Sequence, residues 1–339
     1  MEKINIGING FGRIGRAFTR IVFSRQKKLR FKITAVNTRK SRPDQLAYLL
    51  KYDSVYGRFG AVVKAEEDGI VVDGQKIAAY NFSDPAEIPW DEAGVQIVLD
   101  ATGAFREKSL LERHLHGGVK RVVLSAPAKD DDMPHIVLGV NNDVLEDKPQ
   151  VISNASCTTN SASPLFMVLD ASFKVKKGFL ITTHAYTSSQ PLLDEAGKTF
   201  TRSRAAALNI VPTTTGAAKA VVRTLPHLKG KIDAMALRVP VPTGSLSIVV
   251  AEVEKSTTEQ EVNQAFKAAA ERELKGILKY EEEALVSSDY IGSSYSAVFD
   301  ANYTKVLDGN QITVCAWYDN EWGYSTRLVE LIDRIAAQL

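Results

Sequence analysis

The first half of the chain alternates short apolar runs with longer segments of helical periodicity. The apolar runs are rich in β-branched residues and lie at 4–9, 31–37, 95–102, 121–126 and 135–140, with helical patterns from about Ile14 and through 45–52. Strands that alternate with helices form βαβ units, whose strands are parallel and whose helices cover both faces of the sheet. The pattern predicts an α/β domain with a doubly wound parallel sheet. Residues 61–82 read as small inserted antiparallel strands that turn at Asp68-Gly69 and Asp73-Gly74.

The pattern changes after Ser156 to longer strands grouped with helices. Strand patterns occupy 178–187, 233–241 and 246–254, and amphipathic helical patterns occupy 258–273 and 322–339. This grouping predicts a second, α+β domain built on a mostly antiparallel sheet. We therefore expect one domain over residues 1–156, completed by a C-terminal helix at 321–339, and a second over 157–320. Segment 188–210 is long and weakly periodic, and loops of that length are usually functional.

Composition narrows the class of protein. The 339 residues are 45% hydrophobic and 24% charged, with a formal net charge of +2. That charge is too close to zero to indicate nucleic acid or membrane partners. The N-terminal MEKINIGING has no signal-peptide pattern and no apolar stretch approaches 18 residues, so we expect a cytoplasmic enzyme. The two cysteines, Cys157 and Cys315, indicate neither a disulfide framework nor a metal site.

Glycines follow the first predicted strand in a spacing that suits a dinucleotide. INGFGRIGR places Gly10, Gly12 and Gly15 in G-x-G-x-x-G where a strand gives way to a helix. Such glycines permit a tight turn and let backbone N–H groups approach a pyrophosphate at the positive end of the helix. The pattern alone could be a chance turn. With the flanking strand, helix and second strand, it favours dinucleotide binding in a Rossmann-type domain.

One cysteine and one histidine are candidates for catalysis. SNASCTTN puts Cys157 at the start of a predicted helix, where the helix dipole and free amide donors lower the pKa of a thiol. His184, at the end of the predicted strand in LITTHAYTS, could serve as its acid–base partner. A lone buried cysteine or strand histidine is more often structural, and Cys315 in ITVCAWY is assigned to that class. His114, His116, His135 and His227 show no metal-ligand spacing and are interpreted as surface or packing residues.

A set of motifs along nearly the whole chain resembles phosphorylating glyceraldehyde-3-phosphate dehydrogenases. The set comprises INGFGRIGR, AYLLKYDSVYGRF, LSAPAKD, SNASCTTN, THAYT, RAAALNIVPTTTGAAKA, RVPVPTGS, ELKGIL and WYDNEWGYS. The resemblance implies oxidation of D-glyceraldehyde 3-phosphate to 1,3-bisphosphoglycerate with NAD(P) and inorganic phosphate, through a thiohemiacetal and a thioester on Cys157. It also implies a homotetramer. Two alternatives stay open, an erythrose-4-phosphate dehydrogenase and a non-catalytic scaffold that retains the fold.

The resemblance also implies residue roles. Cys157 and His184 would be catalytic, Thr187 and Arg238 would hold the phosphate of the substrate, and Asn320 would hold the nicotinamide carboxamide. The implied site for inorganic phosphate comprises Ser156, Thr158, Arg202, Thr215 and Gly216. The remaining cofactor contacts that match are Arg13, Ile14, Thr102, Gly103 and Ser125.

The loop after the second predicted strand bears on the choice between NAD and NADP. VNTRKSRPD lacks the acidic residue that usually accepts hydrogen bonds from the ribose of NAD, and offers Asn37, Thr38 and Arg39 there, followed by Lys40 and Arg42. Arginine suits a 2′-phosphate, and Ala196 stands where the resembling proteins commonly carry proline. A solvated basic loop is the plain alternative. We expect the enzyme to use NADP or NAD and to favour NADP, with Arg39 as the leading phosphate contact.

Overall fold

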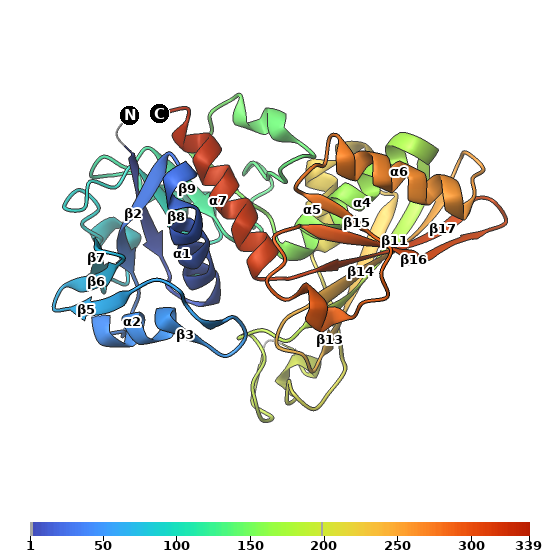
Figure 1. Ribbon diagram of the computed structural model, residues 1–339. Helices are drawn as coiled ribbons and strands as arrows, with labels where there is room; N and C mark the ends of the chain where they lie inside the picture. The colour runs from blue at the N-terminus through green and yellow to red at the C-terminus, as the bar shows by residue number, and fades with distance from the viewer. Residues whose placement is uncertain (1–2, 198) are drawn as a thin grey trace. The chain divides into compact units, whose positions relative to one another are not determined.

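The computed structural model describes residues 3–197 and 199–339, which divide into two compact units (Figure 1). The first unit comprises residues 1–136, 142–155 and 325–339, and the second comprises residues 137–141 and 156–324. The helix α7 (Trp322–Ala336) begins in the second unit and continues through the first.

An eight-stranded sheet organises the first unit, with the strand order β10-β9-β8-β1-β2-β7-β6-β5. The six strands from β10 to β7 are mutually parallel, and β6 and β5 extend the β7 edge as an antiparallel meander. The strands are β1 (Ile4–Asn9), β2 (Phe31–Asn37), β5 (Val63–Glu66), β6 (Gly69–Val72), β7 (Gln75–Tyr80), β8 (Ile97–Asp100), β9 (Arg121–Leu124) and β10 (Val151–Ser153). A ribbon of β3 (Tyr52–Asp53) and β4 (Gly57–Arg58) lies outside this sheet, and the helices are α1 (Arg13–Arg25), α2 (Pro43–Lys51) and α3 (Lys108–Glu112).

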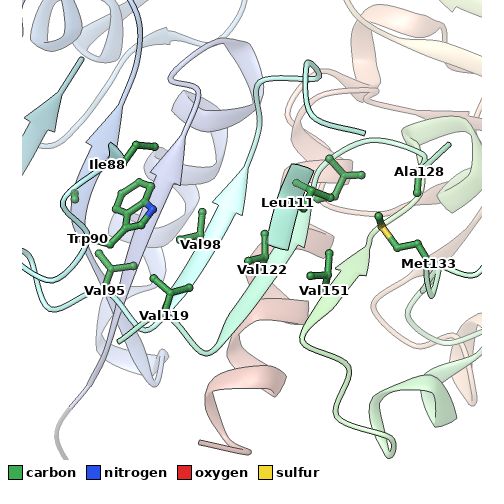
Figure 2. Packing of buried hydrophobic residues seen from close by; sticks show 12 residues of the cluster. Ile88, Trp90, Val95, Val98, Leu111, Val119, Val122, Ala128, Met133 and Val151 are labelled. Atoms are coloured by element: carbon green, nitrogen blue, oxygen red, sulfur yellow. The ribbon is translucent and has the colours of Figure 1, made fainter. Parts of the chain in front are cut away.

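The predicted α/β class of this sheet is confirmed, with two local corrections. The strand predicted at 135–140 is wrong, because His135 makes only an isolated bridge to Ser153 and the chain then turns at Gly139, which has φ +86°. The meander belongs to the main sheet, and its first turn falls at Glu67-Asp68, one residue before the predicted position. Buried apolar side chains from the strands and their connections form a core cluster in this unit, and Trp90 belongs to it (Figure 2).

A seven-stranded sheet organises the second unit, with the order β12-β13-β11-β14-β17-β16-β15. Four of its six strand pairs are antiparallel, which confirms the predicted α+β class, while β11–β13 and β15–β16 are parallel. The strands are β11 (Val175–Ala185), β12 (Val211–Thr214), β13 (Ile232–Val239), β14 (Ser245–Val253), β15 (Leu278–Glu281), β16 (Ala297–Leu307) and β17 (Gln311–Tyr318).

Three helices pack on this second sheet. They are α4 (Cys157–Phe173), α5 (Ala217–Thr224) and α6 (Glu259–Glu271), and α4 contacts both of the others. Local sequence explains where they begin, since Ser156 caps α4 and Thr258 with Glu261 forms a capping box on α6. The catalytic candidates Cys157 and His184 thus lie on a helix and a strand that pack together.

Short 3₁₀ helices complete the structure at Gln26–Lys28, Pro85–Glu87, Asn142–Leu145, Thr201–Ser203, Pro226–Leu228 and Ser287–Tyr290. Among the described residues of segment 188–210, the 3₁₀ helix Thr201–Ser203 is the only helix or strand and the rest is turns and irregular chain, as the weak periodicity predicted.

Candidate active site

Cys157 is the first residue of α4, where the chain leaves a loop and enters a helix. The side chain of Ser156 accepts a hydrogen bond from the backbone N–H of Thr159, at 3.1 Å, and so caps the helix. This cap leaves the Cys157 side chain at the positive end of a 17-residue helix. The thiol is therefore held on a rigid element.

His184 faces that thiol from the neighbouring strand. Its Nε2 lies 3.4 Å from Sγ of Cys157, within hydrogen-bond distance for sulfur. The parallel register of β11 and β13 places Arg238 beside His184, and Nη1 of Arg238 lies 2.7 Å from Nδ1 of the imidazole. The sheet thus brings together three residues that the sequence predicted to act in one site.

Two contacts compete for Nδ1 of His184. The Arg238 guanidinium only donates, so pairing with it makes Nδ1 an acceptor and puts the proton of the neutral ring on Nε2, towards the sulfur. The Ala185 carbonyl, 2.7 Å from Nδ1, only accepts, so pairing with it puts the proton on Nδ1 and leaves Nε2 as the acceptor. Nη1 of Arg238 also lies 2.8 Å from that carbonyl and can donate to it in either case.

Burial dominates the protonation of this pair. Burial, reinforced by the charge of Arg238, lowers the pKa of His184 to about 3. Burial also raises the pKa of the Cys157 thiol above its ordinary value, although the charge of Arg238 and hydrogen bonds from Thr158 oppose the rise. This direction is opposite to the lowered thiol pKa predicted from the helix start, since desolvation of the thiolate outweighs the favourable charges. Burial therefore favours the uncharged forms of both side chains in the ligand-free protein.

Tyr318 contacts the elements that carry Cys157 and His184 and was not predicted as a site residue. Its hydroxyl bridges Thr158 Oγ1, at 3.0 Å, and Thr182 Oγ1, at 2.8 Å, and its ring meets the His184 ring edge to face. The phenol thus ties the first turn of α4 to β11. In the sequence, Tyr318 resembled an ordinary strand aromatic, and only its place at the end of a strand before Asp319-Asn320 hinted at more.

Arg202 reaches β12 from the long segment 188–210. Its Nε donates to Thr213 Oγ1, at 2.8 Å, and its Nη2 donates to the Thr214 carbonyl, at 3.3 Å. Because β12 pairs with β13, this guanidinium lies close enough for its charge to lower the pKa of Arg238 and of His184. Two arginines therefore gather beside the thiol–imidazole pair, which favours anionic ligands.

Hydroxyl groups and a helix start accompany the arginines. Gly216 precedes α5 without a side-chain cap, and Thr215 Oγ1 accepts from the N–H of Ala217 at 3.2 Å. Thr187 follows β11 and its hydroxyl lies 2.8 Å from that of the exposed Ser189. The structure therefore places the predicted phosphate-binding residues on four parts of the second unit: the start of α4, the strands β11 and β13 with the residues just after β11, segment 188–210, and the turn before α5.

Asn320 is held by hydroxyl groups that the sequence did not single out. Its side-chain oxygen lies 3.0 Å from Ser245 Oγ and 3.3 Å from Thr243 Oγ1. Ser245 in turn accepts from the N–H of Ala185, at 3.2 Å, beside His184. These contacts hold the amide group in one orientation and leave its nitrogen for a ligand.

The first unit contains a cavity of about 610 Å³ at the carboxyl ends of β1, β2 and β8. Predicted cofactor residues that line it are Gly10, Gly12, Asn37, Thr38, Arg39 and Thr102. The Gly10 position has φ +96°, and a Cβ there would lie 2.7 Å from the backbone nitrogen of Thr102. A glycine is needed for both reasons, as the G-x-G-x-x-G motif indicated. Carboxyl ends of parallel strands beside a helix start are where open α/β sheets bind dinucleotides, so the residues fit such a ligand.

Other predicted cofactor residues do not line this cavity. Ile14 and Gly15 lie in the first turn of α1, Gly103 lies in the turn after β8, and Ser125 follows β9 and donates its N–H to the Asp100 carbonyl. Arg13 forms an ion pair with Asp53 and lies over the ring of Tyr56. The lining residues that the sequence missed are Asn9, Phe11, Lys40, Phe82, Ser83, Ala101, Ala104 and Phe105. Of these, Asn9 and Phe11 stood in INGFGRIGR and Lys40 stood in VNTRKSRPD, both of which were considered for the cofactor.

The basic side chains of the loop after β2 differ in whether an acidic side chain pairs with them. Among the residues that the structure describes, none forms a hydrogen bond or ion pair with the exposed guanidinium of Arg39. Arg42, by contrast, makes a two-bond contact with Asp44, with distances of 3.0 and 2.9 Å. In the ligand-free protein Asp44 at the start of α2 takes two donors of Arg42, and Arg42 is not among the residues that line the cavity.

Outside these two sites we examined the second cysteine, possible metal ligands and possible membrane-spanning helices. Cys315 is buried in β17, and burial raises its pKa to about 11, so it is a packing residue. Across residues 3–197 and 199–339, no group of three or more His, Cys, Asp or Glu side chains could hold a metal ion. Within the same ranges no helix has both the length and the apolar character to cross a membrane.

Comparisons with known proteins agree over the full chain. Residues 4–108 match the family described as glyceraldehyde 3-phosphate dehydrogenase, NAD binding domain, and residues 156–320 match its C-terminal domain. The chain is 50% identical to glyceraldehyde-3-phosphate dehydrogenase 2 of Streptomyces avermitilis over 337 residues and 50% identical to the enzyme of Streptomyces coelicolor over 338. It is 49% identical to the glyceraldehyde-3-phosphate dehydrogenase of Geobacillus stearothermophilus over 336 residues. Each of these alignments covers 99% of both proteins. The chain therefore belongs to the glyceraldehyde-3-phosphate dehydrogenase family.

Proposed function

We propose that the protein oxidises D-glyceraldehyde 3-phosphate to 1,3-bisphosphoglycerate with a nicotinamide dinucleotide and inorganic phosphate. The observation that carries this proposal is the Cys157–His184 pair, 3.4 Å apart at a helix start, in a chain whose residues 4–108 and 156–320 match the two domains of the family. The dinucleotide, when bound, supplies the acceptor for a hydride.

Cys157 forms and breaks the covalent bonds. Its sulfur adds to the aldehyde carbon, and the thiol proton moves to the aldehyde oxygen, which gives a thiohemiacetal. The hydride then leaves that carbon while His184 Nε2 accepts the hydroxyl proton, which gives a thioester. An oxygen of inorganic phosphate attacks the thioester carbon, the C–S bond breaks, and the sulfur takes back a proton. The oxidation is thereby conserved in an acyl phosphate.

The contact with Arg238 would control when His184 can accept that proton. We propose that in the ligand-free protein Nδ1 accepts from Arg238 and the ring proton occupies Nε2. When the phosphate of the substrate takes the guanidinium donors, Nδ1–H can donate to the Ala185 carbonyl, 2.7 Å away, and Nε2 becomes an acceptor. The bound anion also neutralises the charge that lowers the pKa of His184. Substrate binding would thus make the imidazole basic.

We assign the two phosphates to different groups. Arg238 and Thr187 would hold the phosphate of the substrate, because Arg238 directly contacts His184 and Thr187 lies two residues beyond β11. Arg202, Thr215 and Gly216, with Ser156 and Thr158 at the helix start, would hold inorganic phosphate. The test is the separate dependence of the rate on each ligand in the arginine variants described in the Discussion.

We further propose that the cofactor pocket accepts NADP and prefers it to NAD. No acidic residue is among those that line the cavity of the first unit, and Thr38 offers a neutral hydroxyl where a carboxylate would exclude a 2′-phosphate. Arg39 and Lys40 line the same cavity. Steady-state kinetics with each cofactor, with and without phosphate, would test the proposed reaction and this preference together. Asn320 would orient the carboxamide of either cofactor.

We also propose that the protein is a homotetramer. Five large apolar side chains on segment 188–210 are exposed, namely Leu192, Leu193, Phe200, Leu208 and Ile210. Such a concentration of apolar surface marks an association site. Light scattering with size separation would measure the mass, and a monomer at micromolar concentration would contradict the proposal. A cytoplasmic location stays a prediction.

A further inference from the structure

A chain of buried polar side chains runs behind the cofactor cavity of the first unit. The Asp100 carboxylate is fully buried at the end of β8, and so is the ring of His114 in the loop after α3. Both residues were absent from the predicted site, and His114 was interpreted as a surface or packing residue. A carboxylate and an imidazole that are both 0% exposed require a partner for every polar atom, since an unpaired buried charge is costly.

Asp100 holds the turn that forms one wall of the cavity. Its Oδ1 accepts from the backbone N–H of Thr102, at 3.1 Å, and from the Thr102 hydroxyl, at 2.7 Å. That hydroxyl accepts in turn from the N–H of Ala104, at 3.1 Å. Ala101, Thr102 and Ala104 all line the cavity, so the shape of this wall depends on where the carboxylate lies.

The same carboxylate is linked to the opposite wall through two asparagines. Asn9 donates to Asp100 Oδ2 at 2.8 Å, and Asn37 donates to the Asn9 side-chain oxygen, also at 2.8 Å. Asn37 then accepts from the N–H of Phe82 at 2.8 Å. Asn9, Asn37 and Phe82 line the cavity, so the ends of β1, β2 and β8 and the loop after β7 share one continuous set of hydrogen bonds. The Asn37 amide is occupied by these contacts and leaves ribose recognition to Thr38 and Arg39.

His114 anchors this set to the hydrophobic core. The indole N–H of Trp90 can only donate, and it lies 3.2 Å from His114 Nδ1, which must therefore accept. The proton of the neutral ring then resides on Nε2, 3.4 Å from Asp100 Oδ2, and is donated to the carboxylate. Trp90 is fixed within the apolar cluster of Figure 2, where a Cβ on Gly7 would lie only 2.5 Å from its ring. The carboxylate is thus linked, through His114, to a side chain that is fully buried in the core.

We propose that Asp100 and His114 are positioning residues for the cofactor pocket, with Trp90 as their anchor. They fix the walls in the geometry that binds a dinucleotide, so that little ordering is required when the ligand arrives. The proposal rests on the proposed function in so far as the cavity must bind a nicotinamide dinucleotide.

Three variants test the proposal by their dissociation constant for NAD and NADP, measured by calorimetry on the full-length protein. His114→Leu removes the donor to Asp100 and should weaken binding of both cofactors about tenfold, while kcat and the KM for the aldehyde stay near the wild-type values. His114→Gln can place an N–H near the Nε2 position and should recover most of the affinity. His116→Leu, two residues away, removes only a contact to the Pro85 carbonyl and should bind as the wild type does.

The outcomes separate this proposal from the function on which it rests. A wild-type protein that binds neither cofactor would contradict the proposed function, whereas wild-type affinity in His114→Leu would overturn the positioning role alone. Equal losses in His114→Leu and His114→Gln would also overturn it, because the donor would then be irrelevant. If His114→Leu does not fold, Trp90→Phe removes the indole N–H at small change in shape, and unchanged affinity in that variant would refute the proposal.

Discussion

The choice between NADP and NAD should depend on two residues of the loop after β2, Thr38 and Arg39. A double variant, Thr38→Asp with Arg39→Leu, restores the carboxylate that accepts from the ribose of NAD and removes the guanidinium nearest the 2′-phosphate position. Both positions line the cavity, and no described residue competes for the Arg39 side chain. The variant should therefore turn the preference towards NAD.

The size of the change follows from two contributions. A hydrogen bond to a charged group contributes about 1.5–3 kcal/mol, and the exposure of Arg39 places it at the low end of that range because solvent screens the pair. An added carboxylate about 4 Å from a phosphate repels it by roughly 1 kcal/mol in water. The sum of roughly 2.5 kcal/mol corresponds to a decrease of about 70-fold in the ratio of kcat/KM for NADP to kcat/KM for NAD.

The assay is the initial rate with each cofactor at saturating aldehyde and phosphate. Arg42→Leu is the matched control, because Asp44 already occupies that guanidinium and the ratio should not change. A wild-type ratio far below one that is unchanged in the double variant would mean that the basic run is only surface. An equal decrease in Arg42→Leu would show that net charge, and not the Arg39 contact, selects the cofactor.

Other predictions concern the second unit. Arg238→Ala should mainly raise the KM for the aldehyde and Arg202→Ala mainly the KM for phosphate, each about tenfold to a hundredfold, and identical defects in initial-rate kinetics would refute the division of the two phosphates. Because burial raises the pKa of Cys157, iodoacetamide labelling of the ligand-free protein should still accelerate with pH at the ordinary thiol pKa of 9.0, and a plateau below pH 7 would contradict the resting thiol. The pKa of His184 is about 3 in the folded state and 6.5 in the unfolded state, so the unfolded chain binds more protons between these pH values. Lowering the pH from 8 to 5 should therefore decrease the free energy of unfolding more in the wild type than in His184→Gln, as measured by denaturant titration at the two pH values. Equal pH dependence in the two proteins would count against the buried neutral imidazole.

Periodicity predicted the fold well because burial follows it closely. Strand β2 occupies the predicted range 31–37, and β14 alternates buried and half-buried residues along its length. The failure at 135–140 has a specific cause, since Gly139 adopts a left-handed conformation and the apolar residues around it are buried without joining the sheet. The apolar pattern indicates which residues are buried, and in this segment they are buried without strand pairing.

The site was predictable to the extent that chemistry lies in local motifs. Gly10 and Cys157 stand at strand-to-helix turns that the sequence displays. Tyr318, Ser245 and His114 act through contacts with residues distant in the chain, and no local pattern marks them. The thiol pKa also depends on burial by the assembled fold, which is why reasoning from the helix start alone gave the opposite direction.

Trapping the covalent intermediate on Cys157 tests the central claim most directly. The protein would be mixed with D-glyceraldehyde 3-phosphate and cofactor without inorganic phosphate, quenched in acid and examined by mass spectrometry of its peptides. The account predicts a 3-phosphoglyceroyl group on Cys157, one per chain, which phosphate discharges as an acyl phosphate and which is absent in Cys157→Ser but present in Cys315→Ser. Turnover in Cys157→Ser, or product formation in the wild type with no adduct on that cysteine, would contradict it.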